Sequence, residues 1–278
     1  MGVKELEKKA AQIRLDALTA IHKAGAGHSG STMSVIEILV ALYYGELFGT
    51  PVMKFDSKKP QWDEQDYLVL SKGHAVPAQY AILADNGFFD KSELDFLGNE
   101  NAMLRSRPYS KIPGIAATVA SHGHGLSLAL GIALCLKMER KPNKVFAVLG
   151  DGELQEGQVW EACMAASHYN LSNLIAFVDN NKVQSDGQVC GIMNVDPIQD
   201  KFEAFGWNVV QVRDGHNFDE ILDALERAFT SNRKPVCVWC HTVVGKGIDF
   251  AEGKAGYKGV PLSEGEMADV ELKLKELI

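Results

Sequence analysis

Two polar loops follow two apolar runs in the middle of this chain, and their residue types suit a divalent cation. Asp151 and Gly152 come directly after an apolar run at 144–150, and Asn181 comes directly after another at 174–180. A carboxylate and an amide supply the oxygen ligands that Mg²⁺ and Ca²⁺ prefer, and glycine lets phosphate approach the backbone closely. The pattern therefore favours a cation that holds a diphosphate.

The elements around these loops are expected to bring them together. The runs at 144–150 and 174–180 indicate buried parallel strands, and the segment 156–169 between them has helical spacing. In a strand–helix–strand unit both loops lie at the carboxyl edge of one parallel sheet, where α/β proteins bind ligands. Asp151 and Asn181 are therefore expected to be neighbours in space, although they are 30 positions apart.

Apolar periodicity predicts alternating strands and helices along the rest of the chain. Further strands are expected at 66–74, 206–215 and 235–242, and helices at 4–23, 34–47, 75–86, 126–138 and 218–230. This alternation predicts an α/β fold, a parallel sheet with helices on both faces, in a single domain over 1–278. Ser34 and Glu37 have the spacing of a capping box at the start of the helix at 34–47.

Composition argues against several classes of protein. A formal charge of −8 disfavours a nucleic-acid scaffold, and no apolar run approaches the roughly 20 residues of a membrane span. The start MGVKELEKKA indicates a charged helix rather than a signal peptide, so a cytoplasmic location is expected. The five scattered cysteines indicate buried thiols; Cys237 and Cys240 lie in a strand-like run, where alternation points their sulfurs to opposite faces and disfavours a shared metal or redox site.

Several motifs occur in one order along nearly the whole chain: AGAGHSG, LSKGHA, IPGI, GHGLSLALG, GDGELQEG, VDNNKVQSDG and VGKG. In this combination the chain resembles the first half of a transketolase, the domain that binds the diphosphate end of thiamine diphosphate. The resemblance implies a two-carbon ketol transfer from a ketose or ketose phosphate donor to an aldose acceptor. It also implies a split enzyme, because the chain ends where the pyrimidine-binding half should begin. A separate C-terminal subunit, in an α2β2 assembly, would then be required for activity.

The resemblance assigns roles to individual residues. Asp151, Asn181 and the backbone carbonyl of Val183 would bind Mg²⁺ or Ca²⁺. The implied cofactor-binding set is Gly150, Asp151, Gly152, Glu156, Asn181, His74 and His122. The implied catalytic set is His28, His74, His122 and Lys258, with imidazoles that donate hydrogen bonds and move protons near pH 7. Glu156 and Glu161 would lie at the subunit junction.

Some positions depart from the family pattern around the expected sugar pocket. Arg107 and Lys258 each replace a histidine, His122 stands in place of an apolar residue, and His124 replaces a glutamine. These changes predict a non-standard sugar substrate. Arg107 or Lys258 would meet an anionic group or a different hydroxyl pattern, and together with His28 they form the expected substrate-binding set.

Other functions are compatible with parts of the pattern. An α-type subunit of a 2-oxo acid dehydrogenase is disfavoured by the Gly-His motifs at His28 and His74, and a deoxyxylulose phosphate synthase is normally one longer polypeptide. A cofactor-free regulatory paralogue would not need Asp151, Asn181 or Glu156. Each of these side chains also has a purely structural interpretation, as a turn residue, a strand-ending amide or a solvated helix charge.

Overall fold

A five-stranded parallel sheet forms the centre of the computed structural model, which describes residues 1–60 and 62–278. The strand order is β3-β4-β5-β9-β8, and every neighbouring pair is parallel. The strands are β3 (Tyr67–Leu70), β4 (Val145–Gly150), β5 (Leu174–Asn180), β8 (Asn208–Val212) and β9 (Val236–His241). All of them overlap the strands expected from the sequence.

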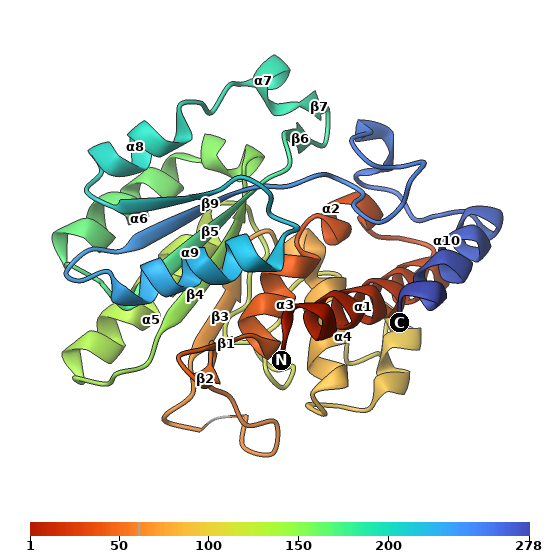
Figure 1. The fold of residues 1–278 in the computed structure, drawn as a ribbon, viewed down its shortest axis with the longest axis horizontal. Coiled ribbons are helices and arrows are strands. Elements are labelled where there is room, and N and C mark those ends of the chain that lie inside the picture. The colour runs from red at the N-terminus through yellow and green to blue at the C-terminus, as the bar shows by residue number, and fades with distance from the viewer. Residues whose placement is uncertain (61) are drawn as a thin grey trace.

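Helices cover both faces of this sheet (Figure 1). One face packs against α5 (His124–Met138), α6 (Gly157–His168) and α8 (Ile198–Ala204), and the other against α1 (Val3–Ala24), α3 (Ile36–Tyr44), α4 (Val76–Asp85), α9 (Phe218–Thr230) and α10 (Glu264–Leu277). Along β4, Phe146 and Val148 belong to the second of these cores, whereas Ala147 and Leu149 belong to the first. This alternation is the period of a strand with two buried faces, and it confirms the predicted fold class.

Shorter elements connect these layers. They are α2 (Ser29–Met33), α7 (Val189–Ile192), the hairpins β1 (Glu46–Leu47) with β2 (Thr50–Pro51) and β6 (Val183–Gln184) with β7 (Gly187–Gln188), and the 3-10 helices η1 (Gly73–Ala75), η2 (Lys91–Phe96), η3 (Gly152–Gln155) and η4 (Ala255–Tyr257). Several of them lie at the carboxyl edge of the sheet, where they carry polar side chains.

The capping box predicted at Ser34 and Glu37 is wrong. Helix α3 begins at Ile36 without a side-chain cap. Ser34 Oγ instead donates to Asp179 Oδ2 at 2.7 Å, and Glu37 Oε1 accepts from Arg14 Nη2 at 2.5 Å. All four side chains are buried. Leaving a buried charge without a partner costs more than leaving a helix start uncapped, so the tertiary partners take both side chains.

The cysteines follow the prediction in part. Cys237 and Cys240 are fully buried and lie in different cores, on opposite faces of the sheet, as expected. Cys163 is also buried, but Cys135 and Cys190 are exposed, so the expectation of buried thiols is wrong for these two. Both exposed residues lie on short or solvent-facing helical segments, whose apolar spacing does not distinguish an inner from an outer face.

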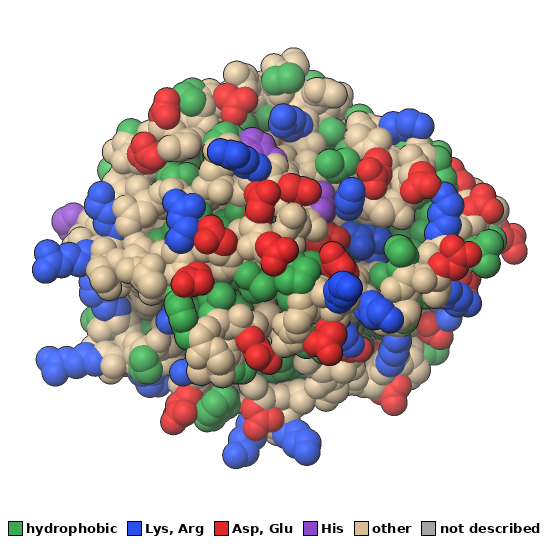
Figure 2. Space-filling view, in the orientation of Figure 1, with side chains coloured by type: hydrophobic (Ala, Val, Ile, Leu, Met, Phe, Trp, Pro, Cys, Tyr) green, Lys and Arg blue, Asp and Glu red, His purple; other side chains and the backbone are tan. Residues whose placement is uncertain are grey.

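Charged side chains of both signs are interspersed over the face shown in Figure 2. No helix among the described residues combines the length and the apolar character needed to cross a bilayer.

Candidate active site

The two predicted loops meet at the carboxyl edge of the sheet. Gly150, the last residue of β4, pairs in register with Asp179 of β5. The backbone N–H of Lys182 donates to Asp151 Oδ2 at 2.6 Å, and the backbone N–H of Asp151 donates to the carbonyl of Asp179 at 3.2 Å. Asp151 therefore lies beside the loop that carries Asn181, as the sequence predicts.

A cavity of about 240 Å³ opens at this edge. Its lining includes most of the predicted site residues, namely His28, His74, Arg107, His122, Gly150, Asp151, Gly152, Glu156, Asn181 and Lys258. Val183 and Glu161 are not in the lining. A larger cavity of about 570 Å³ lies elsewhere, between Phe55, Tyr67 and the segment 110–116, and contains none of the predicted residues. The smaller cavity is the candidate site, because carboxylates, cations and imidazoles from distant segments converge there.

Asp151 has the surroundings of a cation ligand. Its carboxylate is 1% exposed. Burial, and then the neighbouring charge of Asp179, raise the pKa of Asp151 to about 6. A buried carboxylate beside a second carboxylate is stabilised by a cation. The ammonium of Lys258 already donates to the carbonyl of Val183, so a positive group is drawn to these oxygens in the protein itself.

The oxygen set fits a hard divalent cation. Among the described residues no three His, Cys, Asp or Glu side chains gather as a metal site, so amide and carbonyl oxygens have to complete the coordination. Asn181 Oδ1 and the carbonyl of Val183 lie on the same turn, after Lys182, whose φ of 63° is in the left-handed region. That turn brings both oxygens to the side of the loop that carries Asp151.

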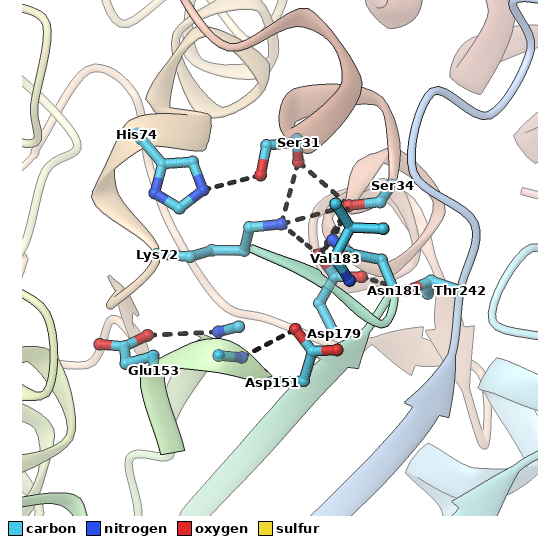
Figure 3. Close-up of polar contacts among 12 residues, drawn as sticks. Ser31, Ser34, Lys72, His74, Asp151, Glu153, Asp179, Asn181, Val183 and Thr242 are labelled. Atoms are coloured by element: carbon cyan, nitrogen blue, oxygen red, sulfur yellow. Dashed lines mark hydrogen bonds and ion pairs between the residues drawn. The ribbon is translucent and has the colours of Figure 1, made fainter. Parts of the chain in front are cut away.

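A buried ion pair that sequence reasoning missed supports this loop (Figure 3). Lys72, 1% exposed, pairs with Asp179, which is fully buried. Lys72 Nζ also donates to the carbonyl of Ser31 at 2.9 Å and to Ser34 Oγ at 3.2 Å, and Thr242 Oγ1 donates to Asp179 Oδ1. Burial raises the pKa of Asp179, but Lys72 lowers it by more, so its pKa stays below the usual value. The signal in the sequence was a charged residue inside the apolar run 174–180, which requires a buried partner.

Glu153 is a second buried carboxylate that the sequence did not single out. Its Oε1 accepts from the backbone N–H of Gly123 at 2.7 Å and from Ser71 Oγ, and its Oε2 accepts from the backbone N–H of Gly150 at 3.2 Å. Burial raises the pKa of Glu153. This side chain joins the loops after β3, before α5 and after β4, which between them carry His74, His122 and Asp151.

Three imidazoles line one side of the cavity. The ring centroids of His28 and His74 are 4.9 Å apart, and those of His74 and His122 are 5.5 Å apart. Burial and the charge of Arg107 lower the pKa of His28 to about 4, and the same two causes lower the pKa of His122. Burial and the charge of Lys72 hold the pKa of His74 well below its usual value. At neutral pH each ring therefore offers one donor and one acceptor.

Arg107 and Lys258 bring positive charge to the same cavity. The hydroxyl of Tyr80 fixes the backbone of Arg107 at 3.0 Å, and Arg107 Nη1 donates to the adjacent carbonyl of Ser106 at 3.3 Å. Within the described ranges Arg107 makes no ion pair with a carboxylate. Burial and the charge of Lys72 lower the pKa of Lys258 to about 8. Two cations beside neutral imidazoles favour an anionic ligand.

A glycine allows Lys258 to reach this position. A Cβ at Gly30 would lie 2.7 Å from the carbonyl of Tyr257 and 3.0 Å from Cα of Lys258, so a larger residue would push the two segments apart. The backbone N–H of Ser31 donates to the carbonyl of Lys258 at 3.2 Å. The close approach explains the glycine in the motif HSGS.

The glutamates predicted at a subunit junction are exposed. Glu156 precedes α6 and lines the cavity, whereas Glu161 lies on the helix outside it. His124 is exposed at the start of α5 and is not part of the lining. The junction role of the glutamates stays a prediction.

Similarity to known proteins extends over nearly the whole chain. A family model described as "Transketolase, thiamine diphosphate binding domain" matches residues 6–275. A 6-deoxy-6-sulfo-D-fructose transketolase subunit from Clostridium sp. (strain MSTE9) is 43% identical, over 94% of this chain and 92% of its own. One of the two subunits of an apulose-4-phosphate transketolase from Phocaeicola vulgatus is 35% identical, over 95% of this chain and 92% of its own.

Solved structures agree with these relatives. Transketolase from Campylobacter jejuni superimposes with a TM-score of 0.91 at 28% identity, over 99% of this chain and 43% of that one. Transketolase from Leishmania mexicana gives a TM-score of 0.90 at 26% identity, over 99% of this chain and 41% of that one. The chain thus matches less than half of these longer enzymes. On the family match, the full-length relatives and the shared fold, the chain belongs to the transketolase family, as its thiamine diphosphate-binding domain.

Proposed function

We propose that this chain is the N-terminal subunit of a two-polypeptide transketolase that transfers a two-carbon ketol unit from a ketose donor to an aldose acceptor. The observation that carries the proposal is the cavity in which Asp151 and Asn181 face His28, His74 and His122. The relatives that match end to end are both named transketolase subunits, which supports transketolase over the other thiamine diphosphate enzymes and over a regulatory paralogue. A cytoplasmic location belongs to the same proposal.

The polar groups of the cavity divide into a cation side and a sugar side. Mg²⁺ would bind Asp151, Asn181 Oδ1 and the carbonyl of Val183. Gly150, Gly152 and Glu156 would adjoin the cofactor, with His74 and His122 across the cavity from them. Bound thiamine diphosphate would supply the electron sink for carbon–carbon cleavage. A cation at Val183 displaces the ammonium of Lys258, which then becomes available to an anion.

The neutral imidazoles of His28 and His74 would hold and move protons at the substrate hydroxyls. Each ring carries one N–H and one free nitrogen at neutral pH, so each can donate to one oxygen and accept from another. Because burial keeps both pKa values low, these rings do not compete for the positive charge that Arg107 and Lys258 supply.

The substrate is proposed to be an anionic, non-standard sugar. One relative is named for a sulfonated ketose and the other for a phosphorylated branched sugar. In this chain Arg107 offers a guanidinium that no described carboxylate pairs, at the mouth of the cavity beside His28 and His122. A planar guanidinium can bind a sulfonate, phosphate or carboxylate with two hydrogen bonds.

Arg107→Ala is expected to raise the KM of an anionic donor or acceptor by at least about 10-fold, because a hydrogen bond to a charged group contributes about 1.5–3 kcal/mol. Steady-state kinetics of the complex over several ketoses and aldoses would measure it. Arg105→Ala is the matched control, since Arg105 is exposed outside the cavity and bonds only a backbone carbonyl at 3.1 Å. Unchanged Michaelis constants for every active substrate would disprove the role of Arg107.

The partner is proposed to be a separate C-terminal subunit with the pyrimidine-binding domain, in an α2β2 assembly. Helices α5 and α6 pack side by side and leave apolar side chains exposed: Leu128 (39%), Met138 (76%) and Met164 (58%). Glu161 lies one turn before Met164 on the same helix. A surface of exposed apolar groups rimmed by charge is typical of a protein interface.

Met164→Asp is expected to weaken the association of the two polypeptides by about 10-fold or more, because a charge would enter an apolar contact. Light scattering coupled to size-exclusion chromatography over a concentration series would measure this. Leu272→Asp is the control, because Leu272 is 66% exposed on α10, away from α5 and α6. Equal association of the two variants would move the interface to another surface.

The proposed activity is tested by a product screen of the reconstituted complex over several ketose donors and aldose acceptors. Calorimetry with thiamine diphosphate and Mg²⁺ on the same complex separates the enzyme from a regulatory paralogue. Binding and ketol transfer are expected. Absence of binding would favour the paralogue.

A further inference from the structure

Helix α2 and the residue after it carry four hydroxyl side chains, all fully buried: Ser29, Ser31, Thr32 and Ser34. The hydroxyls of Ser31 and Ser34 have side-chain hydrogen-bond partners in the candidate site. Those of Ser29 and Thr32 have no partner among the described residues. A single short helix therefore contains hydroxyls that serve the site and hydroxyls that do not, which gives natural internal controls.

Ser34 holds the amide of Asn181. Asn181 Nδ2 donates to Ser34 Oγ at 3.1 Å and to Asp179 Oδ2 at 3.3 Å (Figure 3). Ser34 Oγ in turn donates to Asp179 Oδ2 at 2.7 Å and accepts from Lys72 Nζ at 3.2 Å. The donor and both acceptor positions of this hydroxyl are thereby used.

These bonds decide which way the amide faces. With both acceptors on the Nδ2 side, Asn181 Oδ1 has to face the opposite side, where the backbone N–H of Val183 donates to it at 3.1 Å. Only an oxygen can bind Mg²⁺, so an amide turned by half a rotation would present a nitrogen that repels the cation. Groups that orient a metal ligand in this way contribute strongly to metal affinity.

Ser31 acts on a different side chain. Its Oγ lies 2.7 Å from Nε2 of His74, and its backbone carbonyl accepts from Lys72 Nζ at 2.9 Å. The bond engages Nε2, so Nδ1 is the ring nitrogen that remains for a ligand, and the rotation of the ring is fixed. His74 stands between the rings of His28 and His122, so its orientation affects the sugar side of the cavity rather than the cation side.

We propose that Ser31 and Ser34 are positioning residues with separate duties: Ser34 orients Asn181 toward the cation, and Ser31 orients His74 toward the sugar. The buried ammonium of Lys72 joins the two, because it bonds the carbonyl of Ser31 and the hydroxyl of Ser34. This inference rests on the proposed function, since it deepens the roles assigned there to Asn181 and His74.

Three single variants of the reconstituted complex test the proposal: Ser34→Ala, Ser31→Ala and Ser29→Ala. Two quantities are measured for each: the dissociation constant of Mg²⁺ by calorimetry in the presence of thiamine diphosphate, and kcat and KM at saturating Mg²⁺. Ser34→Ala weakens Mg²⁺ binding by about 10-fold or more and leaves KM of the sugars unchanged. Ser31→Ala lowers kcat/KM by about 10-fold with an unchanged Mg²⁺ constant. Ser29→Ala changes neither quantity.

Parallel loss of both quantities in Ser31→Ala and Ser34→Ala would overturn the proposal, because it would indicate general loosening of α2. An Mg²⁺ constant within twofold of wild type in Ser34→Ala would also overturn it. If Ser34→Ala fails to fold, Ser34→Cys keeps the volume with a weak hydrogen-bonding group, and weaker Mg²⁺ binding is again required. A wild-type complex that binds no thiamine diphosphate with Mg²⁺ would instead overturn the proposed function.

Discussion

Asp151→Asn is expected to abolish cofactor-dependent activity of the complex while leaving the fold at least as stable as wild type. The substitution keeps the shape but removes the one charged oxygen ligand of the proposed cation set. Loss of a group that merely supports a metal ligand already costs about 10–100-fold in affinity, so loss of the ligand charge should cost more than about 100-fold. Calorimetry with Mg²⁺ and thiamine diphosphate measures the loss.

Stability moves in the other direction. Asp151 is 1% exposed, and burial and Asp179 raise its pKa, so its ionised form costs free energy when no cation is present. A neutral amide relieves that cost, and the thermal midpoint of Asp151→Asn without Mg²⁺ should equal or exceed that of wild type. Asp223→Asn, at a mostly exposed site on α9, is the control and should change neither property. Cofactor binding within a few-fold of wild type in Asp151→Asn would exclude Asp151 as the ligand.

Glu37→Gln is expected to lower the free energy of unfolding by about 3–5 kcal/mol, because it leaves the buried guanidinium of Arg14 without a charged partner. Glu37 accepts from Arg14 at 2.5 Å and from His216 Nδ1 at 2.8 Å. The outer atoms of both partners bond the loop after β9: His216 Nε2 accepts from the backbone N–H of Val243 at 2.8 Å, and Arg14 Nε donates to the carbonyl of Lys246 at 2.9 Å. This one carboxylate thus joins α1 and α3 to the loop that follows Thr242.

The effect should depend on pH in a defined window. Burial alone would raise the pKa of Glu37, but Arg14 and His216 together lower it from 4.5 to about 2. A depressed pKa contributes stability that is fully present above about 4.5 and is lost as the pH falls toward 2. The shift corresponds to about 3 kcal/mol, in agreement with the cost of breaking the pair.

Urea unfolding at pH 7 and pH 3 measures this contribution. Wild type should lose much of its advantage over Glu37→Gln at pH 3. Asp95→Asn is the matched control: its ion pair with Lys23 has a similar distance of 2.7 Å but is about half exposed, so its loss should cost less than about 1 kcal/mol. Equal effects of the two substitutions would contradict the importance of burial.

Local patterns predicted a large part of this molecule. The apolar runs before Asp151 and Asn181 are long enough to identify buried strands, and the glycines and polar residues after them mark the turns. Because the carboxyl ends of parallel strands share one edge, the two loops had to meet there. The alternation that separates Cys237 from Cys240 follows from strand geometry alone.

The same reasoning failed where one residue had two possible partners. Ser34 and Glu37 have the spacing of a cap, and that spacing says nothing about Asp179 or Arg14. Ser34 and Asp179 are separated by 145 positions, and Lys72 and Asp179 by 107. The burial of these groups, and hence the cost of leaving them unpaired, is known only when the layers are assembled.

Residue order thus accounts for the parallel sheet and for the meeting of Asp151 with the Asn181 loop, because periodicity and turn chemistry act over neighbouring residues. The orientation of the Asn181 amide, the pairing of Lys72 with Asp179 and the capture of Glu37 by Arg14 follow from the packing of α1, α2 and α3 on the sheet. Buried polar groups must find partners, and packing alone determines which partners lie within hydrogen-bond distance.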